Sequence, residues 1–201
     1  MAKMEGLKSS HHRPAATHTR RVAVGSIADA VIDISCEWGT PVIVVGFGDA
    51  GVAMADCVAL NLGSLEPSIL HALVLMQAPY LGALFSSSKK ISSFFPEQAL
   101  LLHPDHRRVI CQDDPYPSAS VKTISLAFSP PTLDHTIGLL KPIAQQYEQQ
   151  KGEITDGFCS PKDCIIPYSP FIHISDVSVL SPVQGPDDTL LALLSAIELV
   201  L

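Results

Sequence analysis

The amino-acid sequence predicts an α/β fold in which helices cover both faces of a mostly parallel β-sheet. A β-branched run at residues 41–45 and an apolar run at residues 70–76 predict strands, and the second is typical of a strand buried on both faces. Stretches with helical spacing lie before, between and after these runs, and the connections are short. The chain has 201 residues, of which 47% are hydrophobic and 16% charged, so it can bury one sizeable core.

The N-terminal region divides into a tail and a first helix. Residues 1–20 are basic, and their composition predicts a disordered tail; it is also compatible with a mitochondrial presequence. Apolar residues recur at helical spacing over 26–38, and Gly39 is a natural helix end. We therefore expect a single α/β domain over residues 21–201.

The central stretch, residues 41–60, predicts a strand, a tight turn and a helix. Its β-branched run stops at the turn Gly46-Phe47-Gly48-Asp49-Ala50-Gly51, and helical spacing follows to residue 62. Small residues allow the backbone to turn sharply and the helix to pack closely on the strand. Backbone N–H groups at the start of such a helix can bind an anion or an oxyanion. This turn is the candidate functional centre.

The rest of the chain continues the alternation of strands and helices. Further strands are expected at 121–128 and 171–174, and a final helix at 187–201. The segments between them are expected to be a loop with one short helix (79–98), an apolar run (108–112), a helix interrupted at Pro142 (132–150) and a loop with a short strand near Ile165 (157–170).

One interpretation of the central turn is a dinucleotide site. The turn matches G-x-G-x-x-G after a strand and before a helix, which would place Gly46, Gly48 and Gly51 against a pyrophosphate. However, a helix precedes this strand, and the next strand ends at Met76 with no acidic residue for a ribose. Dinucleotide binding is therefore kept as an alternative, and otherwise no cofactor is expected.

The order of elements over residues 26–80 resembles the middle of the α/β-hydrolase family. A strand led by proline, a small-residue elbow and an alanine-rich helix lead into the phrase His71-Ala-Leu-Val-Leu-Met-Gln-Ala-Pro79. In that family the elbow follows G-x-S-x-G. Alignment of the turn with this motif puts Gly46 at the position of the first glycine and Gly48 at the position of the nucleophilic serine. The resemblance implies a three-layer α/β-hydrolase-like fold, truncated at its N-terminal side, in a non-catalytic protein that acts through binding.

A register shifted by one residue implies an active hydrolase instead. Asp49 would then be the nucleophile, as in epoxide hydrolases and haloalkane dehalogenases, and the N–H of Ala50 would face the oxyanion. In that family the acid and the base follow the nucleophile along the chain. The resemblance therefore makes Asp114 the acid, because its turn is similar to the family's turn after a later strand, and it makes His173 the base. Substrates would be small esters, epoxides or halides. The structural alternatives are that Asp49 caps a helix and that His173 is a half-buried strand residue.

Composition and charge limit the classes of partner that this protein is expected to bind. The net charge is −7, and because the first 21 residues are net positive, the rest of the chain is more acidic still, which argues against nucleic-acid binding. No apolar run reaches the roughly 18 residues of a membrane span. The resemblance also implies an open sheet edge that a second copy or another protein would cover. A small-molecule ligand is compatible with the turn.

Cysteine and histidine usage gives no metal centre. The five cysteines contain no C-x-x-C pair, and neither Cys159-x₄-Cys164 nor His11-His12 has the usual ligand spacing. Free buried thiols in a reducing compartment are the prediction. We therefore expect a cytoplasmic protein, with the mitochondrial matrix as the alternative.

Overall fold

The structure, a computed structural model, describes residues 15–61, 63–136, 138–177 and 187–201. Its described strands form a four-stranded parallel sheet in the order β1-β2-β3-β4. The strands are β1 (Val42–Phe47), β2 (Leu70–Met76), β3 (Lys122–Phe128) and β4 (Phe171–Ile174). All four carboxyl ends lie at the same edge of this sheet. The predicted α/β fold with a parallel sheet is confirmed.

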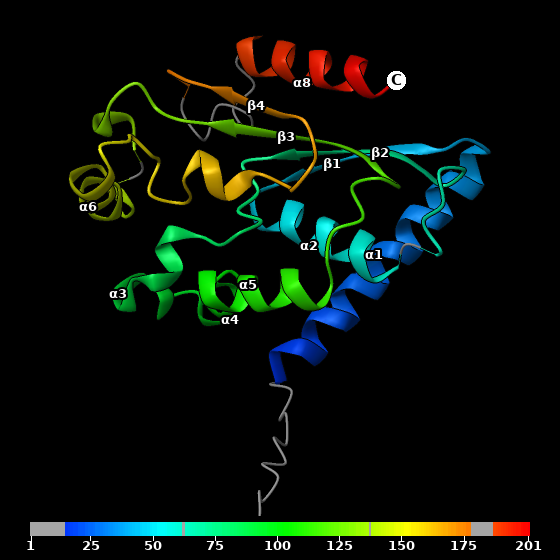
Figure 1. Cartoon of the computed structure of the whole chain (residues 1–201), viewed down its shortest axis with the longest axis horizontal. Coiled ribbons are helices and arrows are strands. Elements are labelled where there is room, and N and C mark those ends of the chain that lie inside the picture. The colour runs from blue at the N-terminus through cyan, green and yellow to red at the C-terminus, as the bar shows by residue number, and fades with distance from the viewer. Residues whose placement is uncertain (1–14, 62, 137, 178–186) are drawn as a thin grey trace, which may run out of the picture.

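Three long helices make the sheet the middle layer. α1 (Ala15–Trp38) and α2 (Gly48–Leu60) lie on one face, and α8 (Asp187–Val200) covers the other (Figure 1). On the face covered by α1 and α2, Leu73 and Leu75 of β2 belong to one buried cluster. On the face covered by α8, Val74 and Met76 belong to another. Because β2 is buried on both faces, its sequence is a continuous apolar run.

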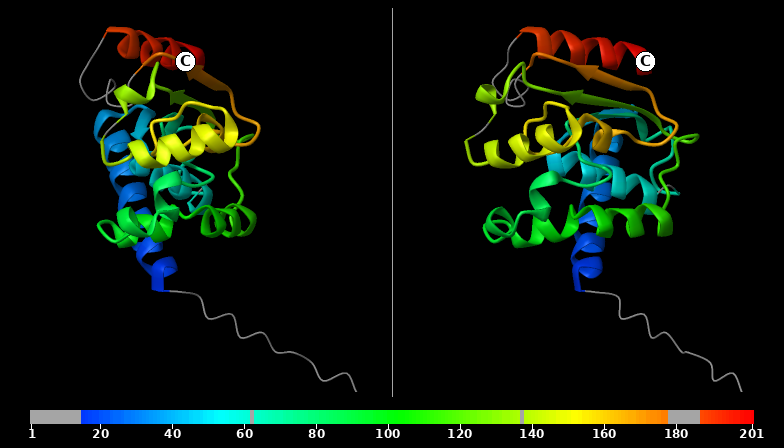
Figure 2. Two further views of the ribbon diagram at one scale, coloured as in Figure 1. Left: turned by 90° about the vertical axis from the view of Figure 1, so that its left-hand side faces the viewer. Right: turned by 60° about the vertical axis from the view of Figure 1, so that its left-hand side comes forward.

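The remaining helices lie in the connections. Between β2 and β3, residues 79–121 form the α3–α5 segment, which lies on the side of the molecule opposite α8 (Figure 2). Its helices are α3 (Lys89–Ser92), α4 (Pro96–Leu101) and α5 (Pro104–Asp113). α6 (Lys141–Lys151) connects β3 to β4, and short 3₁₀ turns occur at Leu84–Ser87, Leu133–His135 and Pro161–Cys164.

Two helices begin elsewhere than the sequence predicts. α1 begins at Ala15, so residues 15–20 are helical although they were assigned to the tail; residues 1–14 lie outside the described part of the chain. α6 begins at Lys141, and Pro142 occupies its first turn. Proline is tolerated there because the first N–H groups of a helix have no intrahelical acceptor. The expectation that Pro142 interrupts a longer helix was wrong.

The expectations that Asp114 follows a strand and that a short strand lies near Ile165 were also wrong. The apolar run 108–112 belongs to helix α5, whose N-cap His103 accepts a hydrogen bond from the N–H of Asp105. Asp114 therefore follows a helix and not a strand. Near Ile165 the described backbone forms a 3₁₀ turn, Pro161–Cys164, where a short strand was expected.

A buried ion pair joins the α3–α5 segment to α2. The Arg107 side chain on α5 is 1% exposed, and its Nη1 lies 2.8 Å from Asp56 Oδ2 on α2. Its Nη2 donates to Asp56 Oδ1 at 3.0 Å, and its Nε donates to the carbonyl oxygen of Tyr80 at 2.8 Å. The guanidinium also lies 5.2 Å from the centre of the Tyr80 ring. This cluster fixes the position of the segment that overlies the carboxyl end of β1.

Candidate functional site

The turn between β1 and α2 is a sharp elbow. β1 ends at Phe47, and α2 begins at the next residue, Gly48, whose φ is +59°. A Cβ atom on Gly46 would lie 2.6 Å from the Cα of Gly51, and one on Gly51 would lie 2.7 Å from the Cβ of Ala78. Gly46 and Gly51 thus allow close packing of helix on strand, while Gly48 adopts a left-handed backbone that favours glycine.

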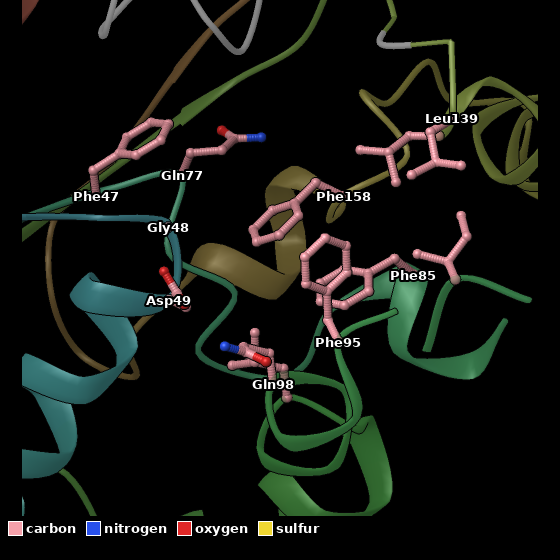
Figure 3. Close-up of a pocket in the computed structure, with 12 residues that line it drawn as sticks. Phe47, Gly48, Asp49, Gln77, Phe85, Phe95, Gln98, Leu139 and Phe158 are labelled. Carbon is pink, nitrogen blue, oxygen red and sulfur yellow. The ribbon is translucent and has the colours of Figure 1, made fainter. Parts of the chain in front are cut away.

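Gly48 faces a cavity at the carboxyl ends of β1 and β2. A Cβ atom on Gly48 would meet no atom within 4 Å, and the residue lines a cavity of about 460 Å³ (Figure 3). In open α/β sheets, ligands bind outside the carboxyl ends of the strands, and this volume lies within the range of small-molecule sites. The cavity above the elbow, hereafter the elbow cavity, is the candidate site.

The wall of the elbow cavity is mostly apolar. Phenyl rings come from β1, from the α3–α5 segment and from the loop after α6: Phe47, Phe85, Phe95 and Phe158. The rings of Phe85 and Phe158 stack with their centres 5.2 Å apart. Ile91, Leu102, Leu139 and Leu140 complete the apolar lining. Among the residues that the structure describes, the polar side chains lining the cavity are Asp49, Gln77 and Gln98, and none of these is cationic.

Gln77, which follows β2, is fully occupied by internal hydrogen bonds. It is buried with φ at +48°, a conformation that few non-glycine residues adopt. Its Nε2 donates to the Phe128 carbonyl oxygen at 3.2 Å and to Asp156 Oδ2 at 2.7 Å. Its Oε1 accepts from the N–H of Phe128 at 2.6 Å. Gln77 therefore has no N–H left for a ligand, and it ties β2, β3 and the loop after α6 together.

Asp156 is a buried carboxyl group behind the cavity wall that the sequence did not single out. It is 1% exposed and accepts hydrogen bonds from Gln77 and from the N–H groups of Phe158 and Cys159. Burial raises the pKa of its carboxyl group to about 6, although these hydrogen bonds oppose the shift. Asp156 itself does not line the elbow cavity; its hydrogen bond with Gln77 connects it to that site. In the sequence, the Asp156-Gly157 pair is typical of a turn. The structure has a turn there, with Gly157 at φ +78°.

Asp49 lies at the elbow cavity, as the shifted register requires. It is exposed, lines the cavity and stands in the first turn of α2. Its Oδ1 accepts a hydrogen bond from the N–H of Ala50 at 3.0 Å. The structure thus pairs the Ala50 N–H with Asp49, although the shifted register assigned it to an oxyanion. A carboxylate in this position also stabilises the positive end of a helix dipole.

The structure does not bring Asp114 or His173 to Asp49. His173 is an exposed residue of β4, and its Nε2 lies 2.8 Å from Ser129 Oγ. Two strands separate β4 from β1, a span of about 14 Å at ordinary strand spacing. Asp114 directly follows α5 as its C-cap, two residues before Tyr116, whose hydroxyl lies 2.5 Å from Thr123 Oγ1 of β3. Asp49 is the member of the predicted triad that lines the cavity.

The topology does not match a dinucleotide-binding crevice. Such a crevice lies where the strand order of a parallel sheet reverses, but the described strands follow the order β1-β2-β3-β4 without reversal. β1 is at one edge of this sheet. Close packing and the left-handed backbone already account for Gly46, Gly48 and Gly51.

Two searches of the described residues gave negative results. Within those ranges, no three or more His, Cys, Asp or Glu side chains are grouped as ligands for a metal ion. None of the described helices combines the length and the apolar character needed to cross a membrane.

Comparison with solved structures identifies the fold. No protein-family model matches the sequence, and no curated protein matches it. The mature form of a lipase from Bacillus licheniformis superposes with a TM-score of 0.68 at 13% identity, covering 90% of this chain and 74% of the lipase. The propeptide form of that lipase gives a TM-score of 0.65 at 14% identity, covering 86% of this chain and 40% of the other. The chain therefore has an α/β-hydrolase-like fold, as the resemblance of residues 26–80 predicted.

Proposed function

We propose that this protein is a non-catalytic α/β-hydrolase-like protein that binds a small apolar ligand in the elbow cavity. One observation carries the proposal. Gly48 has the left-handed backbone of an elbow and open space before it, but no side chain. A hydrolase of this fold presents its nucleophile at the elbow. Without a nucleophile, the elbow cannot form a covalent acyl intermediate.

The lining of the elbow cavity supports an uncharged or cationic ligand. Eight of its twelve lining residues are phenylalanine, leucine or isoleucine, so an alkyl or aryl group would be well accommodated. A free carboxylate would face the Asp49 carboxylate with no cation among the lining residues, which is unfavourable. An ammonium group would be attracted both to Asp49 and to the faces of the phenyl rings.

A binding experiment tests this proposal. Calorimetric titration of the protein with 1-decanol, decylamine and decanoate should show binding of the first two and weak or no binding of decanoate. Gln98→Trp, at an exposed lining position of α4, would fill the cavity and should weaken binding at least tenfold. Leu100→Trp is the matched control, because Leu100 lies on the same helix, is 51% exposed and does not line the cavity. Equal effects of the two variants would contradict the proposed site.

The second candidate function is an active hydrolase with Asp49 as the nucleophile. The observation in its favour is that Asp49 follows Gly48 and lines the same cavity. A base must come within hydrogen-bond reach, and none of the described residues that line the cavity is a histidine. Wild type and Asp49→Asn should therefore both leave p-nitrophenyl butyrate and styrene oxide unchanged. Turnover by the wild type that Asp49→Asn abolishes would establish this second function in place of the first.

A further inference from the structure

Two cysteines come together in the loop that forms one wall of the elbow cavity. The Sγ atoms of Cys159 and Cys164 are 3.4 Å apart, and both side chains are buried, at 0% and 1% exposure. They share a small apolar cluster with Ala127 of β3 and are packed by Phe158 and Phe171. The structure holds both as thiols. A disulfide bond would require the sulfur atoms to approach to about 2.05 Å, a short movement for two side chains already in contact.

The backbone on both sides of the pair is held by hydrogen bonds. Before it, the Cys159 N–H donates to Asp156 Oδ1 at 3.0 Å. Between the two cysteines, Ser160 and Asp163 form a reciprocal capping box around the 3₁₀ turn. The Asp163 carbonyl oxygen accepts from the N–H of Leu81, and the Phe158 carbonyl oxygen accepts from the N–H of Leu84. The fold itself therefore brings the two sulfur atoms together.

We propose that Cys159 and Cys164 form an intramolecular disulfide bond when the chain folds in the presence of a low-molecular-weight disulfide such as oxidised glutathione. One cysteine thiolate attacks the glutathione disulfide, which gives a mixed disulfide and releases one glutathione thiolate. The second cysteine thiolate then attacks the protein sulfur of the mixed disulfide and releases the second glutathione. The two cysteines lose two electrons, the reagent gains them, and the two thiol protons pass to the glutathione products.

The timing follows from burial. Thiol–disulfide exchange needs an accessible thiolate, and both thiols are inaccessible in the folded protein. The bond therefore forms during folding or local opening, and in the native protein it resists reduction. Once formed, it fixes the loop that carries Asp156 and Phe158, and with it one wall of the elbow cavity.

The experiment is folding from denaturant in two buffers, one with reduced and oxidised glutathione and one with reducing agent alone. Each product is quenched in acid, unfolded, alkylated and mapped by peptide mass spectrometry. The oxidised product should carry a Cys159–Cys164 link and alkyl groups on Cys36, Cys57 and Cys111, and the reduced product should be alkylated at all five cysteines. The link should survive dithiothreitol in the native protein and be lost after unfolding in urea.

The oxidised form should melt higher than the reduced form by a few degrees Celsius, the size expected for closing so short a loop in a domain of this length. Cys159→Ala/Cys164→Ala should abolish the difference, and Cys36→Ser, at an exposed cysteine, should keep it. Alkylation at all five cysteines after oxidative folding, or a link between another pair, would overturn the inference. The peptide map of the wild type decides the question even if the double variant does not fold.

Discussion

Replacing Arg107 with methionine should strongly destabilise the protein. The side chain is 1% exposed, forms several hydrogen bonds with Asp56 and donates to the Tyr80 carbonyl oxygen. The variant keeps most of the side-chain volume but removes the guanidinium that neutralises the buried Asp56 carboxylate. Removing one partner of a buried ion pair costs about 3–5 kcal/mol, a large fraction of the roughly 5–15 kcal/mol that stabilises a typical protein. The melting temperature should fall by about 6–20 °C.

Urea unfolding followed by circular dichroism measures this loss. Arg107→Met/Asp56→Leu should recover much of it, because the double variant leaves no charge in the interior. Arg108→Met is the control. Arg108 is the next residue on α5, but it is largely exposed and its pair with Asp105 is solvated, so little change is expected. A loss below about 1 kcal/mol for Arg107→Met would refute the view that this pair anchors the α3–α5 segment on α2.

Three further predictions concern the elbow and Asp156. Gly46→Ala should lower the free energy of unfolding by about 1–3 kcal/mol, because its Cβ would lie 2.6 Å from the Gly51 backbone; an unchanged urea midpoint would contradict the packing account. Gly48→Ser should fold but remain unlabelled by diisopropyl fluorophosphate in intact-mass spectra, since the lining within the described ranges contains no histidine; labelling would show that a complete catalytic centre persists. The pKa of Asp156 is about 6 in the folded protein and about 3.9 when unfolded, so the stabilisation from its bound proton is fully present below about pH 4. As pH rises through 6, wild type should lose about 2–3 kcal/mol relative to Asp156→Asn in unfolding curves, and parallel pH profiles would refute the assignment.

The strands and the elbow were predictable because their patterns are local. A continuous apolar run marks β2, which both faces of the sheet bury, and it matches the structure from Leu70 to Met76. The small residues at 46, 48 and 51 predicted a tight turn, and the resemblance built on it led to the correct fold. The position of Gly48 at the turn was also predictable, and the structure gives it the left-handed backbone of the elbow.

The α3–α5 segment and Asp156 were not predictable because their environment depends on distant residues. The run 108–112 is apolar enough for a strand, yet it is helical because Arg107 and Ile110 turn inward and Arg107 reaches Asp56 on another helix. Asp156 sits in a loop with no periodicity, and its burial depends on Gln77, which is 79 residues away in sequence. Local patterns carry no information about such pairings.

The predicted triad failed to assemble for a similar reason. The order Asp49, Asp114, His173 follows the family, but order along the chain does not fix position in space. The resemblance put Asp114 in a turn after a strand, but in the structure it follows helix α5. His173 was expected near the elbow, but β4 is at the opposite edge of the described sheet.

The central claim, binding at Gly48 without turnover, can be tested directly by nuclear magnetic resonance with methyl decanoate. This neutral ester combines an apolar chain with the bond that a hydrolase of this fold would cleave. We predict that its addition shifts the backbone amide signals of Gly48, Asp49 and Phe158, which line the cavity, and that the ester remains intact in the same tube. Unshifted signals at these three residues, or formation of decanoate faster than in buffer alone, would contradict the account.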